Sequence, residues 1–128
     1  MSSARQTEEN NKMGIRSDVA VCMKSELFSK LPKNVLKWMK ADSSSIQEHP
    51  AGVMFVFEDV KWYVGSDKDI DGLYTWLEEA GDEYGMDWKI VCACNEYPES
   101  EDGNGGGWED NPWNVHKEVS VRLNYEET

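Results

Sequence analysis

Apolar residues are scarce in this chain and are gathered into short segments separated by polar ones. Leu, Ile, Val and Phe together make up about 19% of the 128 residues, and the formal net charge is −12. That combination is close to the composition of intrinsically disordered proteins. Six Trp, five Tyr and six Met supply additional large side chains that a core can bury. We therefore expect a folded domain built from a few short, aromatic-rich elements.

Three segments have the pattern of β-strands. Residues 15–23 carry apolar side chains on one face, and residues 88–95 are apolar on both faces, which is typical of the middle of a sheet. Residues 118–125 alternate most regularly, with one apolar face formed by Val119, Val121, Leu123 and Tyr125.

A fourth apolar stretch, residues 53–63, is interrupted by Glu58 and Asp59. The two acidic residues mark either a bulge in one long strand or the turn of a tight hairpin. The sequence does not distinguish these alternatives.

Two segments are expected to be helical. The first is residues 32–41, which open at Pro32 and carry an apolar stripe. In the second, apolar residues recur at the i, i+3, i+4 and i+7 positions Ile70, Leu73, Tyr74 and Leu77. Ser66 and Asp69 have capping-box spacing, and Gly81 is the expected stop.

The resulting element order is β-α-β-α-β-β. We predict an α+β fold with a four-stranded, mostly antiparallel sheet and two helices on one face, because this arrangement buries every apolar surface. Residues 1–12 are polar and without periodicity, so we expect a disordered N-terminal tail followed by a single domain over residues 13–128.

Charge is distributed unevenly. Residues 1–40 carry a net charge of +4 and residues 41–128 carry −16. An acidic body repels phosphate, so we expect neither direct nucleic-acid binding nor membrane binding. The expected partner is a protein with a basic surface. The sequence has no long apolar span and does not open with a charged and then apolar signal segment, and its cysteine set is odd and sparse, which favours a reduced, cytoplasmic protein.

Two regions concentrate the acidic residues: the outer face of the second helix and the glycine-rich stretch 96–114, which we expect to be a long, mobile loop. Trp108 and Trp113 lie in this stretch and either pack it against the sheet or offer aromatic surface to a partner. The predicted partner-binding residues are Glu78, Glu79, Asp82, Glu83, Glu99, Glu101, Asp102, Trp108, Glu109, Asp110 and Trp113.

One motif suggests a metal site. Asp67, Asp69, Asp71 and Gly72, with Glu78 in the twelfth position, match the EF-hand pattern D-x-[DN]-x-[DN]-G-x5-E. Carboxylates are the hard oxygen ligands that calcium prefers. The same residues open the predicted second helix, where they would point in different directions. A helix start and a calcium loop therefore exclude each other, and calcium is the one cofactor that the sequence suggests.

Other catalytic patterns are missing. The glycine cluster 103–107 is not followed by the Lys-Ser/Thr of a phosphate-binding loop. Cys92, Cys94 and His116 lack the paired spacing of a zinc site. No nucleophile motif is present, so we expect a binding protein rather than an enzyme.

The segment Met13–Val19 (Met-Gly-Ile-Arg-Ser-Asp-Val) resembles the opening of small uncharacterised proteins of phages and prophages, in which an aromatic residue follows Met-Gly. Lys61-Trp62-Tyr63 and Val121-Arg122-Leu123 are similar to their mid-chain and final motifs. This chain differs in Ile15, in its twelve-residue leader and in its longer glycine-rich loop. The resemblance implies a virus-borne accessory protein inside an infected or lysogenic bacterium, and it assigns no catalytic residue.

These observations favour a phage-encoded acidic inhibitor that occupies a basic, nucleic-acid-binding type of surface on a host defence or regulatory protein. Two alternatives remain open. One is a calcium-binding module at residues 67–78, and the other is a small-ligand-binding protein or enzyme.

Overall fold

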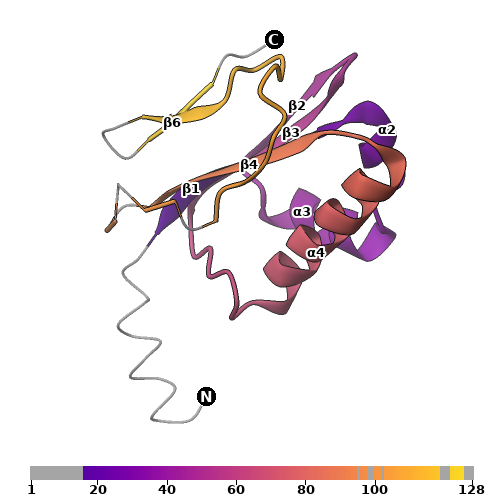
Figure 1. Ribbon diagram of the computed structural model, residues 1–128. Coiled ribbons are helices and arrows are strands. Elements are labelled where there is room, and N and C mark those ends of the chain that lie inside the picture. Colours follow the sequence, from indigo (N-terminus) through magenta and orange to yellow (C-terminus); the bar gives the residue numbers. More distant parts are fainter. Residues whose placement is uncertain (1–15, 95, 98–99, 102, 119–121, 126–128) are drawn as a thin grey trace.

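The computed structural model describes residues 16–94, 96–97, 100–101, 103–118 and 122–125. They form an α+β fold around an antiparallel five-stranded sheet of order β2-β3-β1-β4-β5 (Figure 1). In that order the strands are Ser45–His49, Gly52–Val60, Ser17–Lys24, Trp88–Cys94 and Gly105–Gly106. The predicted α+β class and antiparallel sheet are confirmed, but this sheet has five strands instead of four, and three helices are described instead of two. The predicted tail, residues 1–12, lies outside the described residues.

The central strand, β1, is apolar on both faces, and Val19 to Met23 are completely buried. It pairs with β3 on one side and with β4 on the other. Because successive side chains of a strand point to opposite faces, each face of the sheet needs its own cover.

Three described helices cover one face: α2 (Ser25–Phe28), α3 (Lys33–Asp42) and α4 (Lys68–Tyr84) (Figure 1). The predicted placement of the helices on one face is confirmed. Their apolar side chains pack against alternate residues of the three central strands, including Val21, Phe55 and Ile90. Pro32 precedes α3 with an extended backbone, so α2 and α3 are separate helices. No described helix has the length and apolarity needed to cross a membrane.

The opposite face is covered by residues 108–115 and by a hairpin of β6 (His116–Glu118) and β7 (Arg122–Asn124) (Figure 1). Trp108 and Trp113 pack against the sheet and are only 2% and 0% exposed. The interpretation of these two tryptophans as exposed anchors for a partner is therefore wrong. Both indole rings are buried against the apolar face of the sheet and therefore do not offer their surface to a partner.

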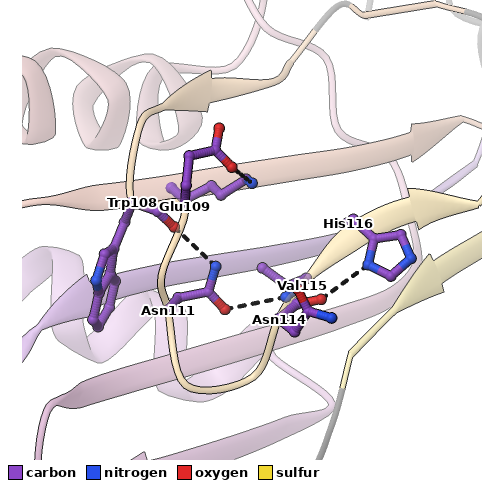
Figure 2. A network of polar contacts seen from close by, with 7 residues as sticks. Trp108, Glu109, Asn111, Asn114, Val115 and His116 are labelled. Carbon is purple, nitrogen blue, oxygen red and sulfur yellow. Dashed lines mark hydrogen bonds and ion pairs between the residues drawn. The ribbon is translucent and has the colours of Figure 1, made fainter.

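A single buried amide fixes the segment that carries these tryptophans (Figure 2). The Asn111 side chain donates to the Trp108 carbonyl at 2.9 Å and accepts from the Val115 N–H at 3.1 Å. The two indole rings meet edge to face, with 6.0 Å between their centroids. A turn closed in this way directs both rings toward the sheet.

The interruption at Glu58 and Asp59 is a bulge rather than a hairpin turn. Ser17 pairs with Val60 while Val19 pairs with Phe57, so β3 carries one extra residue at this point. Asp59 has a φ of 53°, and its N–H donates to the Asp18 carboxylate at 2.8 Å.

Several predicted boundaries are wrong. Residues 45–49, which are not among the segments predicted as strands, form the edge strand β2. The expected single strand 118–125 is the β6–β7 hairpin, and its residues 119–121 lie outside the described residues. The stretch expected to be a mobile loop contains β5 and the ordered turn at Asn111.

Helix α4 passes through the expected stop at Gly81 and ends at Gly85, whose φ is 64°. Gly81 is small for another reason: a Cβ there would lie 2.8 Å from the Trp88 ring. Its packing partner, rather than a turn, explains the glycine.

Two glycines provide a matched test of this packing. A Cβ at Gly52 would lie 2.4 Å from the Met23 carbonyl and 2.7 Å from the Trp108 ring, whereas a Cβ at Gly72, in α4, meets nothing within 4 Å. We expect Gly52→Ala to lower the free energy of unfolding by roughly 1–3 kcal/mol. Gly72→Ala should raise it by roughly 0.5–1 kcal/mol. Urea denaturation measures both, and a neutral Gly52→Ala would contradict the close packing.

Candidate functional site

The outer face of α4 carries four exposed carboxylates in two successive turns. Ile70, Leu73 and Leu77 point into the core, and the helical period leaves Glu78, Glu79, Asp82 and Glu83 on the solvent side. We call these four residues the acidic face. Among the described residues, none of the four forms an ion pair. The sequence predicted that these four residues lie on the outer face of one helix, and the structure places them there.

Glu78 and Asp82 border a groove of about 360 Å³ between α4 and the start of β4. Asp87 adds a third carboxylate to its lining, and the partly buried Trp88 adds an aromatic ring. Gly81 leaves the space that the Trp88 ring fills. A groove with carboxylates beside an indole is suited to a cationic side chain, which both groups attract.

Glu79 and Glu83 border a second groove, between α2 and α4, whose lining includes Lys30 and Tyr84. The Lys30 ammonium lies 4.6 Å from the centroid of the exposed Tyr84 ring. The pKa of Tyr84 is raised, first by its hydrogen bond to Glu83 and then by the charge of that carboxylate. The protein thus already holds one lysine of its own against an aromatic ring that lies beside the acidic face.

The other predicted acidic residues that the structure describes, Glu101, Glu109 and Asp110, do not join this face. Glu109 forms an ion pair with Lys89 at 2.9 Å, so part of its charge is balanced within the protein. Asp110 follows it in the sequence and is exposed. The Glu101 carboxylate accepts a hydrogen bond from Asn104, whose own carbonyl accepts from the Cys92 N–H. Glu99 and Asp102 lie outside the described residues.

Residues 67–78 form the start and the first turns of α4 rather than a loop. Asp67 is the N-cap of α4 and accepts from the N–H groups of Asp69 and Ile70 at 2.9 and 3.1 Å. Asp71 accepts from the Gly65 N–H. Two of the expected ligands therefore initiate the helix instead of converging, and the helix separates Glu78 from them. Asp67 also replaces the predicted cap, Ser66. In the part of the chain that the structure describes, no three acidic, His or Cys side chains gather to hold a metal ion.

A pocket of about 470 Å³ lies near one end of the sheet and was not predicted from the sequence. We call it the end pocket. Its aromatic lining residues are Trp62, Tyr63 and Tyr97, and its hydroxyl-bearing ones are Ser17, Ser66 and Ser100. Cys92 and Cys94, which project from the same face of β4, complete one side. The Lys-Trp-Tyr and Cys-Ala-Cys runs were the only signals in the sequence, and neither indicated that the fold would bring them together.

Tyr74 braces the wall of the end pocket. The Trp62 indole N–H donates to the Tyr74 hydroxyl at 2.9 Å, and that hydroxyl donates to the Gly103 carbonyl. Burial raises the pKa of Tyr74, which keeps the hydroxyl protonated and able to donate. Gly103 has a φ of 91°, and a Cβ there would lie 2.9 Å from the Cys92 side chain. The glycine cluster therefore closes against the sheet, and this closeness excludes larger residues.

The buried thiol of Cys22 predicts how the stability of the protein changes at alkaline pH. Burial raises the pKa of the Cys22 thiol from 9.0 to about 12, against the opposing effect of the Lys89 charge. The folded state then holds its proton more tightly than the unfolded state, so this contribution is fully present below about pH 9 and is lost between pH 9 and 12. We expect the free energy of unfolding to fall across that window.

The measurement is urea denaturation at a series of alkaline pH values for the wild type and for Cys22→Ala. The variant lacks the thiol, so its stability should decline less steeply with pH, whatever its absolute stability. Equal slopes for the two proteins would show that Cys22 does not contribute.

Comparisons of the chain with known proteins gave no match. No protein-family model matches the chain, and no significant match was found among curated proteins or among solved structures.

Proposed function

We propose that this is a phage-encoded acidic binding protein that inhibits a host defence or regulatory protein by occupying a basic surface. The observation that supports the proposal best is the acidic face, four exposed carboxylates in two turns of α4 without an ion pair among the described residues. The viral origin rests on the resemblance at residues 13–19, 61–63 and 121–123, and the cytoplasmic location also on the odd, sparse cysteine set.

Electrostatics gives the proposal its mechanism. A dense negative face on a chain with a net charge of −12 attracts a basic protein before contact and speeds association. Carboxylates arranged along a helix can take the places of nucleic-acid phosphates against rows of Lys and Arg. The inhibitor then excludes nucleic acid from that surface by competition. Inhibition by binding requires no catalytic residue, and none is assigned.

Aromatic side chains in the two grooves supply the short-range part of recognition. Trp88 and Tyr84 take over the role that the sequence suggested for the two buried tryptophans. Both rings lie beside carboxylates of the acidic face, where an incoming Lys or Arg gains cation–π attraction as well as charge pairing. The contact of Lys30 with Tyr84 is an intramolecular example of this mode.

A charge-reversal experiment tests the proposal. The variant Glu78→Lys/Glu79→Lys/Asp82→Lys/Glu83→Lys is compared with the control Glu26→Lys/Asp42→Lys/Glu48→Lys/Glu58→Lys. All eight positions are exposed, and the two variants have equal formal charge. The tagged proteins are used to capture partners from bacterial lysate at low and high salt, with identification by mass spectrometry. Nucleic-acid binding by each captured protein is then measured with and without the inhibitor.

We expect the wild type and the control to retain the same basic protein, to release it at high salt and to block its binding to nucleic acid. The acidic-face variant should lose at least tenfold in affinity. Equal capture by all three proteins would eliminate the acidic face as the interface. Capture without competition against nucleic acid would contradict the proposed mode of inhibition.

A further inference from the structure

We propose that the end pocket binds an uncharged, planar heterocycle of the size of a free nucleobase. This inference does not depend on the acidic face, because that face lies on α4 and none of its four residues lines the end pocket. It rests on the size of the pocket, on the way its walls are held and on the chemistry of the residues that line it.

The size and construction of the pocket suit a small molecule. Its volume of about 470 Å³ falls within the range of roughly 300–1,000 Å³ that is typical of small-molecule sites. Four segments contribute to its walls: the start of β1, the stretch after β3, the end of β4 and the stretch before β5. The Tyr74 hydroxyl connects the second of these to the fourth through Trp62 and Gly103. These two walls are thus held together before a ligand arrives, which lowers the entropic cost of binding.

The mouth of the pocket exposes apolar surface. Val64 is 47% exposed and Tyr97 is 60% exposed, and both line the pocket. They are two of the four large apolar side chains that are exposed in the described part of the chain. Both belong to the lining of one pocket, and the Tyr97 ring provides a surface against which a planar ligand can stack.

The lining also specifies the polarity of the ligand. Serine hydroxyls both donate and accept hydrogen bonds, as the edge of a nucleobase does. The described lining residues include no acidic or basic side chain, so nothing in that part of the wall compensates a ligand charge. A phosphate would also approach a strongly acidic protein. The preferred ligand is therefore the uncharged base itself rather than a nucleotide.

The test is an NMR titration of the full-length, 15N-labelled protein with adenine, with uracil and with adenosine monophosphate. The Trp62 indole N–H reports on the pocket because it lines the wall and donates to Tyr74. We expect at least one free base to shift this signal saturably. Adenosine monophosphate should bind at least tenfold more weakly than adenine if adenine is the base that binds.

Two exposed apolar residues provide the paired variants. Tyr97→Ala removes an aromatic wall of the end pocket, and Ile46→Ala removes an exposed side chain from the edge strand β2, which contributes no described residue to the pocket. Tyr97 is 60% exposed and Ile46 is 40% exposed, so both variants should fold. We expect Tyr97→Ala to weaken binding of the base at least fivefold and Ile46→Ala to leave it unchanged.

Three results would overturn the proposal. The first is the lack of a saturable shift with either base. The second is binding that Tyr97→Ala does not weaken. The third is binding of the nucleotide as tight as that of its free base, which would show that the pocket does not select an uncharged ligand.

Discussion

The burial of β1 on both faces is the constraint on which the rest of the structure depends. Val19, Val21 and Met23 point toward the helices, while Ala20 and Cys22 point toward the opposite layer. A strand of this kind is stable only between two apolar layers, because either bare face would leave a large apolar surface in water. The helices provide one layer. The second layer contains the indole rings of Trp108 and Trp113, which supply apolar surface in a chain that has few aliphatic residues.

Local periodicity predicted the elements that carry a strong pattern of their own. The apolar spacing from Ile70 to Leu77 located α4, and the apolar runs located β1, β3 and β4. Strand β2 was not predicted because Ile46 is its only apolar residue. Its pairing with β3 depends on the turn at Pro50–Ala51 and not on an apolar pattern of its own. The end of α4 was misplaced because Gly81 is required by the neighbouring Trp88 ring, a long-range contact that no local rule reveals.

The two candidate sites also differ in whether a local sequence pattern or long-range contacts form them. The acidic face is a property of one helix and could be predicted from its period. The end pocket joins residues from Ser17 to Gly103, and only the folded chain brings them together. The two tryptophans and the aspartate motif at residues 67–78 were ambiguous in the sequence for a related reason. Each motif is compatible with two uses, and the demands of the sheet and of the helix start determine which is realised.

Strand β5 has a consequence for the behaviour of the protein at high concentration. Gly105 and Gly106 pair with β4, and a Cβ at Gly106 would lie 2.2 Å from the Trp88 carbonyl. Only a strand without side chains fits there, and it is only two residues long. Very short edge strands are one of the means by which proteins prevent sheets from joining edge to edge and aggregating. The glycine run therefore protects the sheet from self-association along β4, in addition to closing one wall of a pocket.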